Sequence, residues 1–325
     1  MGTLTVKTFY AFALLLTIAI TAGFASAQTA SPISTADVVR RAADQRTAYL
    51  NEFKNLISRE VKTYEIYDKK DSIKKERKIT SVFIVYQLSK TKDRAVEFRS
   101  VVEVDGKPIP DAEKRSSDFF TEVVAVQNSQ KELQKLQDET SRYDLDPVID
   151  GLTLNQAVAL ADNMQPYFSF TQVGNETVDG HETIVLAYQQ TKASPFVLAK
   201  SSADSPEGKL AVKYDVNNFS GDVNPRLRGK LWIDAATMQV RKEVRQFTIQ
   251  PDKFASPAVY VEDDLDYTPS DFAILTPKRL VHVQNAIKSK DMTVVKNATV
   301  TFDYGKFTRP DVDVKVIEET PGGAN

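Results

Sequence analysis

The second half of the chain alternates hydrophobic and polar residues in segments that short turns connect. Side chains of a strand point alternately to the two faces of a sheet, so this pattern predicts strands with one buried face. Short turns can join only antiparallel neighbours. The expected hairpins pair 167–173 with 182–190 and 227–234 with 239–249. The remaining expected strands are 61–68, 80–88, 95–104, 259–267, 278–288 and 292–304.

Helical periodicity is confined to the first half of the chain. Ser34 and Asp37 form a capping pattern at the start of a helix expected to run to about Glu60. Further helices are expected over 118–141 and, behind a capping box at Thr153, over 154–164. The sum is a mainly β protein with helices (α+β), in which helices cover the apolar face of a curved antiparallel sheet.

The segment 95–104 gives the clearest alternation in the chain. One face carries Val96, Phe98, Val102 and Val104, which we expect to be buried. The other carries Glu97, Arg99 and Glu103, which we expect to be exposed. Asp105-Gly106 then predicts a hairpin turn. The polar stretch 69–78 is interpreted as a solvated turn, with contact to anionic lipid head groups as the alternative.

The N-terminus has the pattern of a secretory signal peptide. Lys7 precedes an apolar run from Thr8 to Phe24, and Ala25-Ser26-Ala27 gives the small residues of a cleavage site. The alternative is an uncleaved membrane anchor. We expect cleavage after residue 27, a periplasmic or secreted product without a transmembrane anchor, one domain over 28–317, a polar loop or insertion near 191–226, and a disordered tail over 318–325.

Composition excludes several function classes. The 42 Lys and Arg balance the 44 Asp and Glu, so the chain lacks the excess of positive charge that is typical of nucleic-acid-binding proteins. Cysteine is absent and only His181 and His282 could act as imidazole bases. We interpret His181 as an exposed turn residue, His282 as a solvent or rim residue, and the acidic stretch 262–266 as a solvated edge. The sequence predicts no catalytic residue, no metal site and no cofactor.

Two segments resemble a known family of bacterial envelope proteins. The strand Val178 to Leu186 (VDGHETIVL) and the hairpin Gly229 to Lys242 (GKLWIDAATMQVRK) are similar to the LolA/LolB-like outer-membrane lipoprotein sorting family and its RseB/MucB relatives. The resemblance implies an unclosed half-barrel whose concave face holds helices and an apolar ligand cavity. Independently of the resemblance, Trp232 shares its strand face with Arg228, Lys230 and Asp234. We interpret it as a rim residue that can stack under Arg241 or Lys230, with contact to a ligand as the alternative.

The resulting hypothesis is a non-catalytic, monomeric envelope protein that binds a lipid, an acyl chain or a lipoprotein. The candidate cavity lining consists of Val82, Ile84, Tyr86, Phe98, Phe168, Phe170, Leu231 and Ile233. The alternative is a structural or protein-interaction module whose core is filled, and a remote alternative is an exported hydrolase. An open apolar pocket of several hundred Å³ would support the first, and a packed interior the second.

Overall fold

The computed structural model describes residues 33–87, 95–125, 130–200, 209–216, 219, 222–252, 254–288 and 293–310. The leader, the cleavage site, the tail and part of the 191–226 loop therefore lie outside the described residues. All elements below belong to the compact unit Ser34–Asn325.

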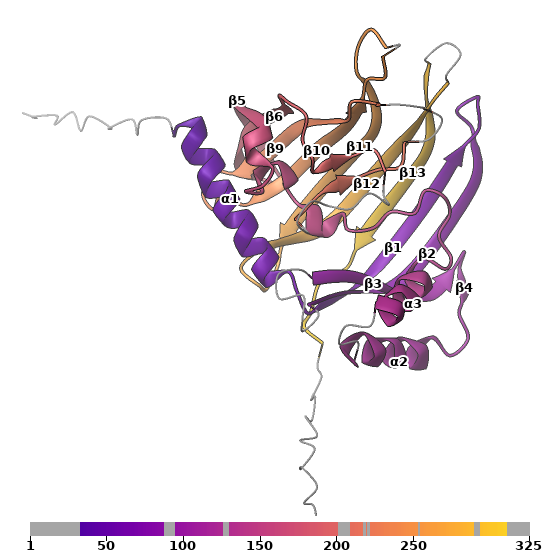
Figure 1. The fold of residues 1–325 in the computed structure, drawn as a ribbon. Coiled ribbons are helices and arrows are strands. Elements are labelled where there is room, and N and C mark those ends of the chain that lie inside the picture. The colour runs from indigo at the N-terminus through magenta and orange to yellow at the C-terminus, as the bar shows by residue number, and fades with distance from the viewer. Residues whose placement is uncertain are drawn as a thin grey trace, which may run out of the picture. The chain divides into compact units, whose positions relative to one another are not determined.

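One open antiparallel sheet of eleven strands dominates the fold (Figure 1). It is an unclosed half-barrel, as predicted, and β4 and β5 form its two ends. The spatial order is β4-β3-β2-β1-β13-β12-β11-β10-β9-β6-β5. The strands are β1 (Leu56–Tyr67), β2 (Ile73–Gln87), β3 (Ala95–Val104), β4 (Lys107–Pro108), β5 (Phe168–Val178), β6 (His181–Gln190), β9 (Arg226–Asp234), β10 (Val240–Ile249), β11 (Ala258–Pro269), β12 (Leu275–Ile287) and β13 (Val294–Tyr304).

The turns between these strands follow the sequence predictions. Asp105 and Gly106 adopt φ of 51° and 75° at the β3–β4 turn, and Asp179 and Gly180 adopt 49° and 79° at the β5–β6 turn. Positive φ at both central positions gives the twist that a tight hairpin requires. The 69–78 stretch, in contrast, is only partly a turn, because β2 already begins at Ile73 and pairs with β1.

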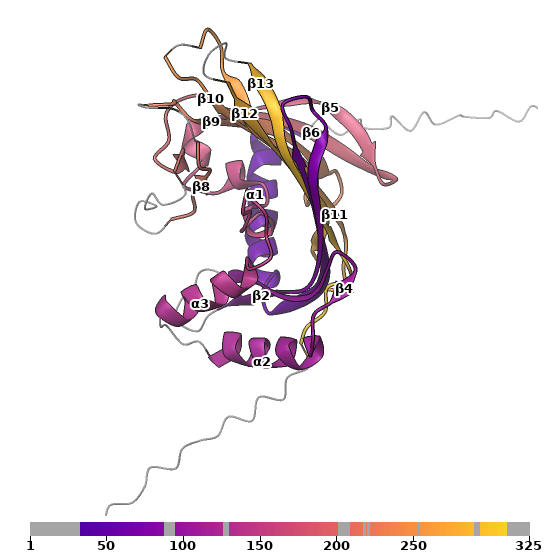
Figure 2. The ribbon, with the colours of Figure 1, turned by 90° about the vertical axis from the view of Figure 1, so that its right-hand side faces the viewer.

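Helix α1 (Thr35–Glu52) lies against the concave face of the sheet (Figure 2). The Ser34 side chain accepts a hydrogen bond from the Asp37 amide, which confirms the predicted cap. The helix ends eight residues before the expected Glu60, because the chain turns into β1 at Leu56. Tyr49 and Phe53 pack on the sheet through Phe83 and Val85 of β2.

Helices α2 (Ala112–Ala125) and α3 (Gln130–Thr140) replace the single helix expected over 118–141. They pack on the opposite, outer face of the sheet at β2 and β3 (Figure 2). Phe119, Val123 and Leu136 cover that face. The Thr140 hydroxyl also accepts the backbone N–H of Arg99, which protects the edge of β3.

No α-helix forms over 154–164, contrary to the capping-box prediction. Three short 3₁₀ turns stand there: η1 (Thr153–Asn155), η2 (Val158–Leu160) and η3 (Gln165–Tyr167). We call residues 144–157 the strap. Its side chains Leu145, Ile149 and Leu152 are buried. The strap crosses the concave face, where its backbone forms hydrogen bonds to side chains of β3, β10 and α1.

The 191–226 segment also contributes to the core. It contains a two-stranded parallel pair, β7 (Val197–Leu198) and β8 (Val212–Lys213). Phe196, Val197 and Val212 are buried against Phe247 of β10 and other apolar residues. The described part of this loop therefore fills the concave side of the sheet near β9 to β12.

Candidate functional site

The sheet separates the eight predicted lining residues into two groups. Val82, Ile84, Tyr86 and Phe98 lie on the outer face beneath α2 and α3. Phe168, Phe170, Leu231 and Ile233 lie on the other face, because Phe170 pairs with Tyr188, whose hydroxyl reaches Glu243 in the concave interior. The first group packs in a core cluster, in which Ile84 is 1% exposed. Only the second group is placed where the resemblance implies a ligand.

The centre of the concave face is occupied by charged side chains that the sequence placed at the surface. Glu97 and Arg99 are each 2% exposed, although alternation predicted solvent contact. The alternation holds from Val96 to Val101, where Phe98 and Glu97 face opposite ways, and a register shift then interrupts it. Of the four residues expected to be buried, Phe98 is fully buried, and Val96, Val102 and Val104 are partly buried. The expectation of exposure was wrong because the strap and α1 cover the face that carries Glu97.

The first buried charge cluster surrounds Arg99. Its Nε donates to Glu60 at 2.8 Å and its Nη2 to Glu97 at 3.1 Å. Glu97 also accepts the backbone N–H groups of Gly151 and Thr153 at 3.1 Å and the Thr153 hydroxyl at 2.6 Å. Burial raises the pKa of Glu97 although Arg99 opposes this. The cluster therefore attaches the strap to β3.

A lysine extends this cluster along β1. The Lys62 Nζ lies 2.8 Å from both carboxylate oxygens of Asp144, and both side chains are nearly inaccessible. Burial lowers the pKa of Lys62, nearby Arg99 adds to this, and Asp144 opposes it. The beginning of the strap is therefore held by an ion pair in which neither charge reaches water.

The second buried charge cluster surrounds Arg245 on β10. Its Nη2 donates to Asp263 at 3.0 Å and its Nη1 to the carbonyl of Asn155 at 2.9 Å. Glu243 accepts the Ala157 amide at 2.8 Å and the Tyr188 hydroxyl at 3.0 Å. This cluster holds the end of the strap.

Asp263 and His282 correct two further predictions. Each is 1% exposed, so Asp263 does not belong to a solvated edge and His282 is not a rim residue. Strand β11, which carries Asp263, lies inside the sheet between β10 and β12. His282 Nδ1 lies 2.6 Å from Asp263, and the Tyr214 hydroxyl donates to the same carboxylate at 2.7 Å.

The electrostatics of Asp263 follow from these contacts. Burial alone would raise its pKa, but Arg245 and His282 outweigh burial and hold the pKa well below its usual range. A paired aspartate and histidine is also part of a hydrolase triad. Here the imidazole is buried and the Tyr214 ring lies 6.0 Å from it, so a substrate has no approach. His181, in contrast, is exposed at a turn, as expected.

Helix α1 contributes a third charged contact to the strap. Arg46 is 7% exposed, and its Nε donates to the carbonyl of Gln156 at 2.9 Å. Burial lowers the pKa of Arg46 to about 10. The Tyr49 hydroxyl donates to the Thr153 carbonyl at 2.9 Å. The buried face of α1 is therefore partly polar, a feature that its apolar periodicity did not predict.

An open groove remains between α1 and β5, at one end of the concave face. Its volume is about 630 Å³. Apolar side chains of Ala36, Val39, Ala43 and Phe170 line it. Arg40, Asp44, Asp162 and Gln165 supply polar groups. Of the eight predicted lining residues, Phe170 is the one that reaches this groove, and β5 is the free edge of the sheet.

Trp232 lies on the outer face, away from this groove. Its cation partner is Lys242, whose Nζ lies 5.9 Å from the ring centroid, and neither of the expected partners. Arg241 is turned to Asp234, at 2.6 Å. The turn between β9 and β10 forms where the sequence predicts a hairpin, and the Asp234 carboxylate accepts the Ala236 and Thr237 amides there.

Among the described residues, no group of three or more Asp, Glu or His side chains is placed to hold a metal ion. No helix among the same residues is long and apolar enough to cross a membrane.

No family model and no curated protein matches the sequence. Solved structures do match. A LolA superfamily protein of Nitrosomonas europaea is 11% identical, with a TM-score of 0.29 and coverage of 86% of this chain and 95% of that one. A lipoprotein-sorting protein domain of Vibrio parahaemolyticus is 8% identical, with a TM-score of 0.33 and coverage of 85% and 93%.

The MucA/MucB complex of Pseudomonas aeruginosa gives 11% identity, a TM-score of 0.20 and coverage of 83% and 99%. The LolA superfamily and MucB, which the two sequence segments resemble, are thus both among the matched structures. Identities of 8% to 11% show similarity of fold alone.

Proposed function

We propose that this chain is a non-catalytic envelope protein that binds the acyl chain of a lipid or lipidated protein in the groove between α1 and β5. The observation that carries the proposal is the groove itself, which has a volume of about 630 Å³. This lies within the range of small-molecule sites, which combine apolar walls with a few polar groups.

The groove residues support an acyl ligand with a polar head. Ala36, Val39 and Ala43 lie on successive turns of α1 and face Phe170 across the groove. Each CH₂ that they bury contributes about 0.8 kcal/mol. Arg40 lies beside them, 3.6 Å from Asp44 and 3.7 Å from Asp37 in exposed ion pairs. Such pairs are weak, so its guanidinium can also meet a carboxylate or phosphate head group.

A second candidate is a protein-interaction module with a filled core. It is favoured by the strap, which occupies the centre of the concave face through Glu97, Arg99, Glu243 and Arg245. Under this interpretation the groove receives no lipid, and partners bind elsewhere on the surface.

Titration with a fluorescent fatty acid separates the two candidates. We expect binding in about the micromolar range, because ordering costs offset part of the CH₂ contribution. Phe170→Asp should abolish binding, since an unpaired charge in an apolar site is costly. Val173→Asp is the matched control, because Val173 is on the same strand, is 52% exposed and does not line the groove.

The unfolding free energy must be measured beside binding. Phe170→Asp should leave the protein folded, whereas Ile84→Asp should unfold it, because Ile84 packs beneath α2 and α3. If the folded wild type takes up no fatty acid, the groove proposal is wrong and the interaction module replaces it.

Envelope localisation is tested separately, at the N-terminus. The protein isolated from the cell envelope or the medium should begin at Gln28, after cleavage behind Ala27. A mature protein that keeps its first 27 residues would contradict an exported, soluble carrier.

A further inference from the structure

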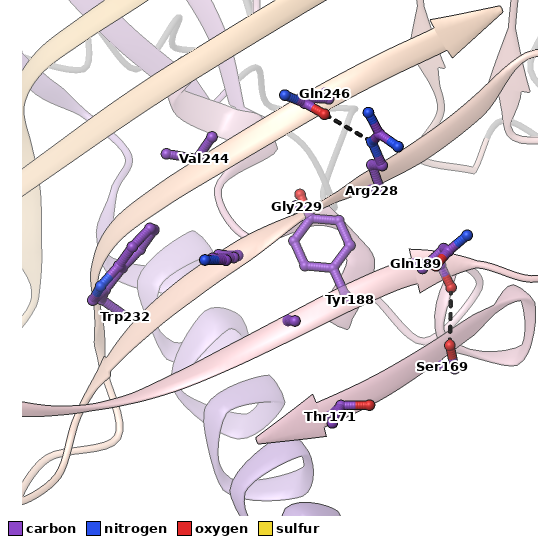
Figure 3. Close-up of a pocket in the computed structure, with 11 residues that line it drawn as sticks. Ser169, Thr171, Tyr188, Gln189, Arg228, Gly229, Trp232, Val244 and Gln246 are labelled. Carbon is purple, nitrogen blue, oxygen red and sulfur yellow. Dashed lines mark hydrogen bonds between the residues drawn. The ribbon is translucent and has the colours of Figure 1, made fainter. Parts of the chain in front are cut away.

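The outer face of the sheet carries a hollow of about 480 Å³ over β5, β6, β9 and β10. Figure 3 shows Trp232 at one end and Arg228 with Gln246 at the other. Its lining also includes Ala187, whose small side chain leaves room between the large ones, and the backbone of Gly229, which faces the concave side through its Cα. The hollow is on the opposite face of the sheet from the α1–β5 groove.

The indole of Trp232 is held in a fixed orientation. Its Nε1 donates to the Glu176 carboxylate at 2.8 Å, and Lys242 lies over the ring. Lys242 is in turn paired with Asp264 at 2.7 Å. An aromatic ring held in one orientation at the wall of a hollow offers a flat apolar surface to a ligand.

The charge of the hollow is positive. Arg228 and Lys230 line it, and no carboxylate does. In the described part of the chain neither cation has a carboxylate within ion-pair distance, whereas Arg279, on the same face, is 3.3 Å from Asp303. The Arg228 Nε donates to Gln246 at 2.7 Å, which orients the guanidinium and leaves its terminal nitrogens for a ligand. Glu262, one strand further, accepts a hydrogen bond from the Gln246 amide.

We propose that this hollow is a second binding site, which takes an anionic sugar ring. The apolar face of the ring lies on Trp232, and its carboxylate or phosphate lies at Arg228 and Lys230. Amide and hydroxyl groups of Gln189 and Thr171 are in place for the sugar hydroxyls. A ring is required because Trp232 and Arg228 lie at different ends of the hollow, with Lys230 between them on the same face of β9, so one compact anion cannot contact the indole and both cations.

Trp232 is the one tryptophan of the chain, so its fluorescence reports directly on this site. The protein is titrated with oligogalacturonate, with glucose 1-phosphate, and with the neutral sugar maltotriose. We expect a saturable change with one or both anionic sugars and none with maltotriose. A response to oligogalacturonate indicates a carboxylate ligand, and a response to glucose 1-phosphate indicates a phosphate ligand.

Variants test the assigned roles. The double variant Arg228→Gln, Lys230→Gln should weaken binding about tenfold or more, since hydrogen bonds to charged groups are lost. Arg279→Gln, an exposed cation of the same face outside the hollow, should leave binding unchanged. Trp232→Ala, followed by calorimetry, should also weaken it. The proposal is overturned by no response at millimolar sugar, by an equal response to maltotriose or inorganic phosphate, or by unchanged binding in the double variant.

Discussion

The same three-residue pattern occurs on two strands that bind the second half of the strap. Glu97-Phe98-Arg99 on β3 and Glu243-Val244-Arg245 on β10 each turn a glutamate and an arginine to the concave face. In both, the glutamate accepts backbone N–H groups of the strap. These two strands therefore hold the strap on the concave face by buried charges, in addition to the Lys62–Asp144 pair and Arg46.

The two clusters differ in how their arginines are paired. Arg245 reaches Asp263 on the adjacent strand, and His282 and Tyr214 close the cluster. Arg99 instead crosses β2, where it lies 4.9 Å from the Phe83 ring centroid, to reach Glu60 on β1. Its third carboxylate, Asp150, is 49% exposed at the side chain. The Arg245 cluster is thus closed, and the Arg99 cluster has one side toward solvent.

The largest effect is expected at the closed cluster. Arg245→Met leaves Asp263 and Glu243 buried without their cation and should lower the free energy of unfolding by about 3–5 kcal/mol. Arg228→Met, an exposed arginine, should cost less than about 0.5 kcal/mol in the same urea titration.

Arg99→Met sharpens the comparison in the same measurement. It should cost less than Arg245→Met, because one of the three carboxylates of Arg99, Asp150, is 49% exposed at the side chain and keeps its hydration. An equal or larger decrease in the free energy of unfolding would show that the exposure of Asp150 does not reduce the cost of removing Arg99.

A smaller loss is expected from removing the glutamate that binds the strap. Glu97→Ala leaves the Gly151 and Thr153 amides without their acceptor and should cost about 1–3 kcal/mol. Glu103→Ala, at a less buried position of the same strand beyond the register shift, is the control. If both variants unfold at the wild-type urea concentration, Glu97 does not hold the strap.

Asp263 and Glu97 should change the free energy of unfolding with pH in opposite directions. The lowered pKa of Asp263 contributes stability that is present above its usual value of about 3.9 and lost as the pH falls below that value. The raised pKa of Glu97 acts oppositely, so its contribution decreases as the pH rises above about 4.3. Urea titrations from acid to neutral pH should show less acid sensitivity in Asp263→Asn, and in Glu97→Gln a stability relative to wild type that rises with pH. The same pH profile in both variants would contradict the comparison.

Alternation and turn chemistry were sufficient for most of the sheet. Strand β3 has the bounds that alternation predicts, and the β5–β6 and β9–β10 hairpins form as expected, because these signals are local. The contents of the concave face were not predictable in the same way. Whether Glu97 faces water depends on a strap more than fifty residues away, and the helix expected at 154–164 is replaced by bonds to Glu243 and Arg245.

A usable signal was nevertheless present in the sequence. The Glu-x-Arg spacing occurs on two strands, and 80–88, the strand beside 95–104, is apolar on both faces. A strand with two apolar faces must be packed against other elements on both faces of the sheet, so the adjacent strand 95–104 is expected to be covered on both faces as well. The outer placement of Val82, Ile84, Tyr86 and Phe98 follows from α2 and α3, whose packing side the sequence did not indicate.

The central claim is that the strap occupies the concave face permanently, and hydrogen exchange of its amides tests this most directly. The Thr153 and Ala157 amides donate to buried carboxylates, so they should exchange about as slowly as amides of the central strands β10 and β11. The exposed β5–β6 turn at Asp179 and Gly180 provides the fast reference. Strap amides that exchange as fast as this turn would show that the strap leaves the concave face readily, and that the face is an open cavity in solution.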